Sequence, residues 1–163
     1  MKTPGKTRGG KWRAMWVSIL TLLAGILLLT VTSCTSGPPQ IDRSSGRLHR
    51  CPKAPACLCS EYSGGKSAVE PLIFTGEPQV AWVMARTAVE EIGGNIEACD
   101  NRYLWATFRS RVIGFVDDLE LRLAASQQLI HVRSASRVGY SDLGVNRKRL
   151  DRLRERFDQL IDE

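Results

Sequence analysis

The apolar run at residues 15–31 constrains this chain most, because a stretch of that length can just span a bilayer. Within the run only Ser18, Thr21 and Thr30 are polar. Several cations and no acidic residue precede it, and this pattern is typical of a secretory signal. In such a signal the charges hold the start of the chain in the cytoplasm while the apolar stretch enters the bilayer. The sequence therefore predicts that the folded part of the chain lies outside the cytoplasm.

The run ends at Val31-Thr32-Ser33-Cys34, which resembles a bacterial lipobox. The resemblance implies a signal peptide at residues 1–33, cleavage before Cys34, and lipid, including palmitate, on that cysteine. The alternative is an uncleaved signal-anchor helix, which also places the domain outside the cytoplasm. Thr35 follows the cysteine where Asp would indicate retention in the inner membrane of many Gram-negative bacteria, so this sorting rule favours the outer membrane. We expect a cell-envelope protein, anchored to a membrane by lipid and facing the periplasm or the exterior.

The charge balance argues against a nucleic-acid partner. The chain has 163 residues, with 23 Lys and Arg against 17 Asp and Glu, and a formal net charge of +6. Removing residues 1–33 leaves 18 basic against 17 acidic side chains. The basic character therefore belongs mostly to the export signal, and we expect no nucleic acid among the partners.

The mature chain divides into a tether and one domain. Residues 34–50 are rich in Ser, Gly, Pro and Arg, which is typical of a tether that could reach roughly 50 Å if fully extended. Residues 51–163 form the predicted domain. Its length allows a single hydrophobic core.

Hydrophobic periodicity predicts an α+β domain. A helix opens at Thr75 or Glu77, with Pro78 in its first turn, and ends at the two glycines 93 and 94. A second helix runs from about Asn146, its N-cap, to Ile161. Residues 71–74 are a further extended candidate. The segments predicted as strands lie between the helices, at residues 95–99, 103–110, 115–123 and 129–136.

This order predicts a two-layer sandwich, an antiparallel sheet of about four strands with two helices on one face. Each helix carries an apolar stripe at helical spacing, which we expect to be buried against the sheet. The two stripes are Val80, Val83, Met84, Ala88 and Ile92, and then Leu150, Leu153, Phe157, Leu160 and Ile161.

Four motifs resemble a family catalogued as domain of unknown function 1499, found in bacterial envelopes and plastids. They are Cys51-Pro-x-x-Pro-x-Cys57, Tyr103-Leu-x-Ala-x-Phe-Arg-Ser-Arg, Gly114-Phe-Val-Asp-Asp-Leu-Glu and the segment 130–149. The resemblance covers roughly residue 51 to the C-terminus. It implies a fold and a set of residues but no activity. Ala56 departs from the family, which usually has Asn at this position.

The cysteines predict two disulfides. With Cys34 lipidated, an even number remains in an oxidising compartment: Cys51, Cys57, Cys59 and Cys99. Since Cys57 and Cys59 are too close to bridge, two pairings stay open: Cys51–Cys57 with Cys59–Cys99, or Cys51–Cys59 with Cys57–Cys99. The first is favoured, because the proline-bounded loop between Cys51 and Cys57 is shaped to close and this pair matches the family motif.

The predicted strands also carry charged side chains on one face. Strand alternation groups Asp118 and Glu120 with Arg133 and Arg137 on the face opposite the apolar one. One interpretation is a set of cross-strand ion pairs on a solvated sheet. The other is an anion site that also uses the N-terminus of the last helix, which would bind a phosphate- or carboxylate-bearing envelope ligand. The residues of this hypothetical site are Arg109, Arg133, Arg137, Tyr140 and Arg147.

Enzyme chemistry has little support in the sequence. There is no G-x-S-x-G elbow, and Ser134 and Ser136 should point away from His131 on the same strand. A metal site is not expected, because the chain has no C-x-x-C pair and His49 is the only histidine near the cysteines. We therefore expect no catalytic residue, metal or cofactor, and predict a non-enzymatic binding or structural component of the envelope. The alternatives are a small hydrolase-like enzyme that uses the Asp/Arg face and a protein–protein scaffold.

Overall fold

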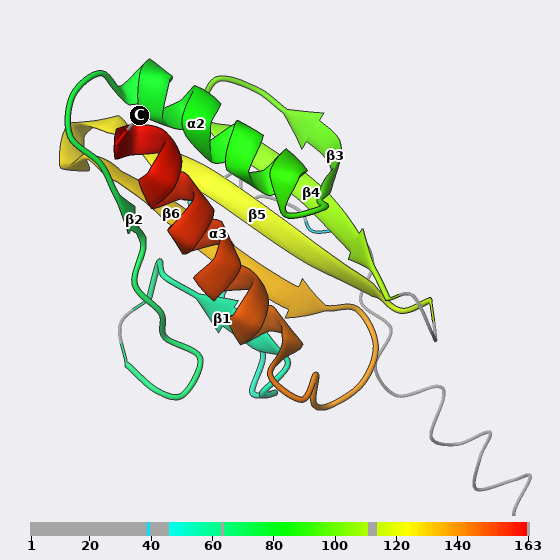
Figure 1. Ribbon diagram of the computed structural model, residues 1–163. Helices are drawn as coiled ribbons and strands as arrows, with labels where there is room; N and C mark the ends of the chain where they lie inside the picture. Colours follow the sequence, from blue (N-terminus) through cyan, green and yellow to red (C-terminus); the bar gives the residue numbers. More distant parts are fainter. Residues whose placement is uncertain (1–38, 40–45, 63, 111–113, 163) are drawn as a thin grey trace, which may run out of the picture. The chain divides into compact units, whose positions relative to one another are not determined.

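The structure is a computed structural model that describes Pro39 and residues 46–62, 64–110 and 114–162 (Figure 1). The predictions of a signal peptide and of lipidation at Cys34 fall outside these residues. Among the helices of the described ranges, none combines the length and the apolar character needed to cross a membrane.

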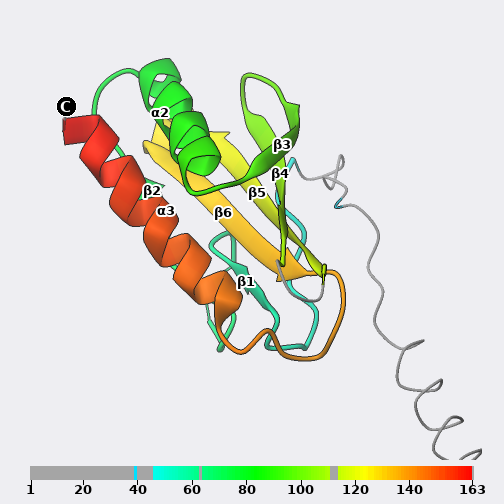
Figure 2. The ribbon, with the colours of Figure 1, turned by 45° about the vertical axis from the view of Figure 1, so that its right-hand side comes forward.

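The described domain has one antiparallel sheet of six strands, in the order β1-β6-β5-β4-β3, with β2 also paired to β6. Helices α2 and α3 lie over the same face of this sheet, as two views of the ribbon show (Figures 1 and 2). The elements in chain order are β1 (Cys57–Cys59), β2 (Leu72–Ile73), α2 (Pro78–Glu91), β3 (Asn95–Cys99), β4 (Tyr103–Arg109), β5 (Val116–Ala124), the short 3-10 helix η1 (Ala125–Gln127), β6 (Leu129–Ser136) and α3 (Val145–Asp162).

The predicted combination of an antiparallel sheet and two helices is confirmed, but the expected number of about four strands is too low. The additional strands, β1 and β2, are three and two residues long. Strand β2 lies within the extended segment predicted at residues 71–74, whereas a segment as short as β1 gives no alternating pattern that could be read from the sequence. Both pair with β6, which therefore has neighbours along both of its edges.

The hydrophobic core lies between the sheet and the two helices. From the sheet it receives side chains such as Leu104, Leu121 and Val132, and from α3 it receives Leu153 and Phe157, all buried. The predicted stripe of α3 is confirmed for Leu150, Leu153, Phe157 and Leu160, while Ile161 is partly buried.

Helix α2 is rotated relative to the prediction. Val80 and Val83 were expected in the core but are 54% and 56% exposed. The stripe is confirmed for Ala88, which is buried, and for Met84 and Ile92, which pack partly buried against the core. The other buried positions are Ala81, Trp82, Ala85 and Val89. The alanines let the helix backbone approach the sheet closely, and the ring nitrogen of Trp82 donates a hydrogen bond to the carbonyl of Asp100 at 2.8 Å. This bond fixes which side of the helix faces inward.

The N-terminus of α3 is capped by a different residue from the one expected. Asn146 was predicted as the N-cap but lies inside the first turn, where it is buried. The carboxylate of Asp142 accepts the backbone N–H of Asn146 at 2.7 Å. Asp142 thus takes the role of the capping side chain, because its position before two turn residues lets its oxygens reach the free N–H groups.

One of the two predicted disulfides is present. Cys51 and Cys57 are bonded, whereas Cys59 and Cys99 are free, so the predicted Cys59–Cys99 bond is wrong. Cys59 lies on β1 and Cys99 on β3, at opposite edges of the sheet. Four strand spacings separate these edges by about 19 Å, and a disulfide needs Cα atoms within about 7 Å. The alternative Cys57–Cys99 pairing fails for the same reason.

The boundary between tether and domain lies earlier than residue 51. Leu48 is fully buried, and the hydroxyl of Tyr62 donates a hydrogen bond to the Leu48 carbonyl at 3.0 Å. The guanidinium of Arg50 stacks on the ring of Tyr62. Residues 47–50 therefore belong to the domain. The composition of this segment predicted a tether, but its Leu48 is buried.

Candidate functional site

The face of the sheet away from the helices carries two carboxylates that are buried rather than solvated. Glu120 is 0% exposed and accepts hydrogen bonds from Arg133 at 2.6 Å and from the Tyr103 hydroxyl at 3.0 Å. Asp118 is 4% exposed and accepts two bonds from Arg137, at 2.8 and 2.9 Å. The predicted cross-strand ion pairs are therefore present, but the expected solvated face is not.

The titration of these groups follows from their surroundings. Burial, together with the neighbouring Glu120, raises the pKa of Tyr103, which keeps this hydroxyl a hydrogen-bond donor. The hydrogen bonds to Asp118 raise the pKa of Arg137. Trp105 donates its ring N–H to Asp118 at 2.8 Å, so this carboxylate accepts three hydrogen bonds. Arg133 and Arg137 are neutralised by these partners and are poor candidates for binding an external anion.

A second group on this face surrounds His131. Its Nδ1 hydrogen-bonds the Ser60 hydroxyl at 3.2 Å, and the same hydroxyl oxygen accepts the N–H of Val132 at 2.8 Å. Glu61 forms ion pairs with Arg122 and Arg47 close by. Burial lowers the pKa of His131, against the opposing effect of Glu61. Ser60 is thus the partner of His131, and no motif in the sequence pairs these two residues.

This pKa makes a prediction about stability. Because the pKa of His131 is lowered in the folded state, the unfolded chain binds a proton first as the pH falls. We expect the free energy of unfolding to decrease when the pH falls below about 6.5, the ordinary histidine value, and to continue falling until the folded pKa is passed. The His131→Gln variant should show a smaller decrease between pH 7 and pH 5.5 in urea unfolding. An equal decrease in both proteins would assign the effect to other groups.

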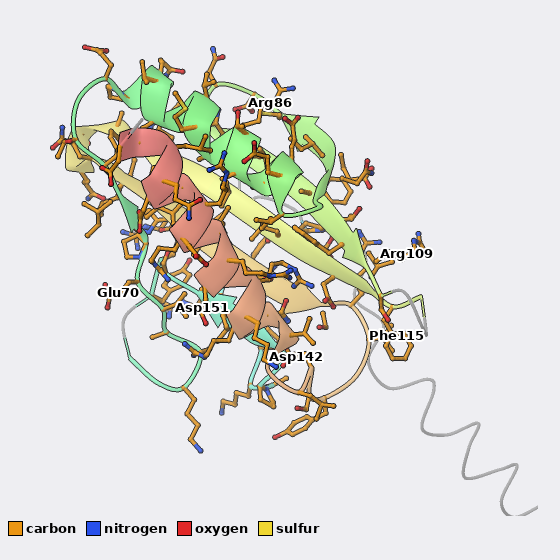
Figure 3. The ribbon with its side chains drawn as sticks, in the orientation of Figure 1. Glu70, Arg86, Arg109, Phe115, Asp142 and Asp151 are labelled. Atoms are coloured by element: carbon orange, nitrogen blue, oxygen red, sulfur yellow. A yellow bond between two sulfur atoms is a disulfide. The ribbon has the colours of Figure 1, made fainter. Side chains whose placement is uncertain are left out.

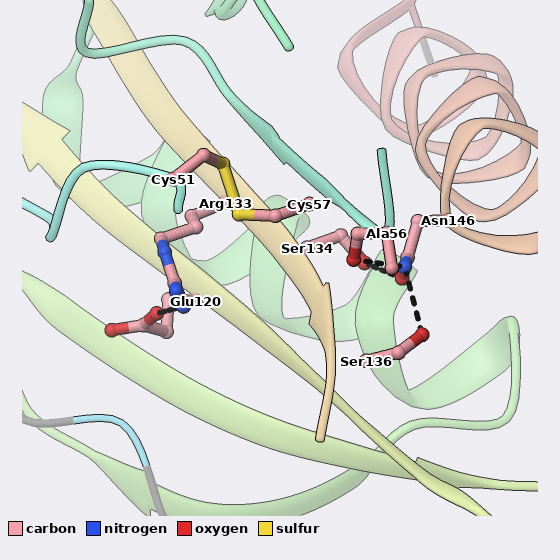
Figure 4. The surroundings of a disulfide bond; sticks show 8 residues. All are labelled: Cys51, Ala56, Cys57, Glu120, Arg133, Ser134, Ser136 and Asn146. Atoms are coloured by element: carbon pink, nitrogen blue, oxygen red, sulfur yellow. Dashed lines mark hydrogen bonds and ion pairs between the residues drawn. A yellow bond between two sulfur atoms is a disulfide. The ribbon is translucent and has the colours of Figure 1, made fainter. Parts of the chain in front are cut away.

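On the helix side of the sheet a buried polar network holds the start of α3. The side-chain amide of Asn146 donates to the carbonyl of Ala56 at 3.0 Å and to the hydroxyl of Ser136 at 3.2 Å, and its oxygen accepts from Ser134 at 2.6 Å (Figure 4). Arg149 binds Asn146 and Ser134 and forms an ion pair with Asp117 at 2.6 Å. The network fixes α3 against β6 and against the loop that precedes β1.

The two serines of β6 do not lie beside His131. Ser134 and Ser136 face the helix, as predicted, while His131 lies on the opposite face with Ser60. Asp117 and Asp118 also point to opposite faces, toward Arg149 and Arg137 respectively. Across the described ranges, no cluster of three or more His, Cys, Asp or Glu side chains could hold a metal ion.

A basic pocket lies beside the N-terminus of α3. It has a volume of about 560 Å³, and its walls come from the disulfide-closed loop before β1, the loop after β1 and the loop between β6 and α3. Its charged members are the cations Lys53, Lys66 and Arg147 and the single acid Asp142. The other lining residues are Ala54, Pro55, Leu58, Ser67, Tyr140, Ser141 and Gly144.

The acid of the pocket is already engaged. One oxygen of Asp142 accepts the N–H of Gly144 at 3.1 Å and the other accepts the N–H of Asn146 at 2.7 Å. Asp142 thus compensates the partial positive charge of the helix end. The three cations that line the pocket outnumber this single acid. The pocket therefore has a net positive charge and a size suited to a small anionic ligand.

The five residues of the predicted anion site do not come together. Tyr140 and Arg147 line the basic pocket, but Arg133 and Arg137 lie on the other face of the sheet, paired with Glu120 and Asp118. Arg109 is exposed at the end of β4. The prediction failed because it placed the strand cations and the first turn of the last helix on the same face of the sheet. In the structure α3 covers the face opposite to Arg133 and Arg137. Lys53 and Lys66, which complete the pocket, stand in short loops with no periodic signal.

Comparison with known proteins gives a family but no relative of known activity. The family described as "Protein of unknown function (DUF1499)" matches residues 47–157. No curated protein matches the sequence.

Proposed function

The chain belongs to the DUF1499 family, and the description of this family names no reaction. We propose that this member is a lipid-anchored envelope protein that binds an anionic group in the basic pocket. The single observation that carries the binding proposal is the arrangement of Lys53, Lys66 and Arg147 around one helix N-terminus. Because Asp142 already compensates the helix end, the three cations supply the attraction for an anion, and they repel one another unless an anion lies between them. The chemical class of the ligand is a phosphate or carboxylate group.

Binding rather than catalysis is supported by the state of the other polar clusters. The buried carboxylates Asp118 and Glu120 and the partly buried Asp117 are all bonded to arginines inside the domain. They hold the fold together and offer no general acid or base next to the pocket. Within the pocket itself the titratable acid, Asp142, caps α3.

The test of binding is thermal unfolding of the full chain in neutral detergent, with phosphate or chloride at equal ionic strength. Phosphate at about 100 times its dissociation constant should stabilise the wild-type protein by roughly 2.7 kcal/mol, a shift of several degrees. The shift should disappear in Arg147→Gln. It should persist in Lys148→Gln, which removes the neighbouring exposed cation outside the pocket. Equal shifts in both variants, or none in the wild type, would refute the proposed site.

The lipid anchor has a separate test. Cells that express the full chain with labelled palmitate should incorporate label into the wild-type protein and not into Cys34→Ala. Label that survives this substitution would mean that Cys34 is not the acylated residue, and absence of label in the wild type would favour the uncleaved signal-anchor.

A further inference from the structure

An exposed apolar surface lies where β6 leads into α3. Leu143 is 90% exposed and Tyr140 is 69% exposed, and three further apolar side chains nearby in the fold are also exposed. Leu143 has a φ of 52°, in the left-handed region that leucine rarely adopts. We call this surface the apolar tip, and its members are Phe115, Val138, Tyr140, Leu143 and Val145.

The strand register brings the members of the apolar tip to one end of the sheet. The N–H of Arg137 donates to the carbonyl of Val116 at 3.1 Å, so Phe115 and Val138 leave the sheet at the same end. Figure 3 shows Phe115 pointing outward there, with Asp142 in the loop before α3. Isolated exposed apolar side chains are ordinary, whereas a group of this size at one end of a small domain marks a contact surface.

The basic pocket adjoins the apolar tip, because Tyr140 belongs to both. The pocket contributes Lys53, Lys66 and Arg147, and the exposed Lys148 follows in the same turn of α3. An apolar centre with a cationic rim is complementary to the interface of an anionic bilayer. There phosphates meet the cations, and the boundary of the acyl chains meets the apolar side chains. An acidic protein could satisfy the charges as well, but it would need its own apolar patch in register.

We propose that this surface docks on a bilayer of anionic phospholipids, with a headgroup phosphate in the basic pocket and the apolar tip in the interface. The inference rests on the proposed function, since it uses the anion pocket and the anchor at Cys34. About 12 residues separate Cys34 from Gly46, so an anchored domain stays within roughly 40 Å of the membrane. Such confinement gives a high effective concentration, and a weak surface contact is then sufficient to orient the domain.

The experiment places a fluorophore on the apolar tip of the full chain reconstituted in vesicles. Leu143→Cys is labelled in a Cys99→Ser background, because Cys99 is the exposed thiol of the described domain while Cys59 is buried and Cys51–Cys57 is bonded. The matched control carries the label at Ser126→Cys, in the turn between β5 and β6 at the opposite end of these strands. The vesicles contain phosphatidylcholine with brominated acyl chains, with or without phosphatidylglycerol.

The label at residue 143 should be quenched by brominated lipid in the phosphatidylglycerol vesicles, and the label at residue 126 should not. Adding Arg147→Gln should lower the equilibrium constant for docking about fivefold, and adding Arg152→Gln, farther along α3 and outside the pocket, should leave it unchanged. The proposal would be overturned if the label at residue 143 were quenched no more than the label at residue 126. Equal quenching without phosphatidylglycerol, or shielding of residue 143 by a co-extracted acidic protein instead of lipid, would overturn it as well.

The phosphate melt separates this inference from the proposed function. Stabilisation by phosphate without quenching at residue 143 would leave the anion pocket standing and refute docking on the bilayer. Quenching that depends on phosphatidylglycerol and Arg147, without any phosphate shift, would support docking and refute the binding of small free anions.

Discussion

Replacing Glu120 with leucine should destabilise the domain by about 3–5 kcal/mol, because it removes one partner of a buried ion pair. Arg133 would keep its charge with its side chain only 13% exposed, and the Tyr103 hydroxyl would lose its acceptor. The measurement is urea unfolding of the full chain in detergent, followed by tryptophan fluorescence.

The double variant Glu120→Leu with Arg133→Met should recover most of this loss, since an apolar pair of similar volume often matches a buried ion pair. As a matched control, Glu90→Leu breaks the exposed pair with Arg86 and should cost less than about 1 kcal/mol. A loss below about 1 kcal/mol in Glu120→Leu itself would mean that water reaches this face of the sheet.

Phe157→Ala should cost about 3–5 kcal/mol, the usual range for a buried phenylalanine, because the ring is fully buried at the centre of the contact between α3 and the sheet. The same unfolding measurement applies. We expect the slope of the free energy of unfolding against urea concentration to be unchanged, because unfolding exposes nearly the same surface area in the variant.

Val83→Ala is the control for this variant and tests the orientation of α2. The sequence pattern places Val83 in the core, but the structure exposes more than half of it. We expect a change within about 0.5 kcal/mol, as for surface substitutions in general. A loss above about 2 kcal/mol would mean that the helix is rotated as the apolar periodicity predicted.

The sequence predicted the strands more accurately than the packing of the helices against them. Strands β3 and β6 begin and end where alternation placed them, because each has enough residues to display a period of two. The rotation of α2 could not be predicted, since small alanines pack inward where the pattern favoured the larger valines Val80 and Val83. The hydrogen bond from Trp82 that fixes this rotation joins residues from different elements.

The candidate site was predicted only in part. Arg147 and Tyr140 were found, because a charged first turn of a helix is visible in the sequence. Arg133 and Arg137 were misplaced, since the face that α3 covers depends on packing and not on the alternation of one strand. Lys53 and Lys66 lie in loops that are far from Arg147 in the sequence. Folding brings these loops and Arg147 together in one pocket.

The Cys51–Cys57 bond has a consequence for where in the cell the pocket exists. Lys53, Ala54 and Pro55 stand between the two cysteines, so one wall of the pocket belongs to a covalently closed ring. In the reducing cytoplasm thiols stay unpaired, and the ring opens into a free segment of chain. If the chain is exported as we propose, a newly made chain carries Arg147 and Lys66 without their facing wall, and the proposed anion site forms only in an oxidising compartment.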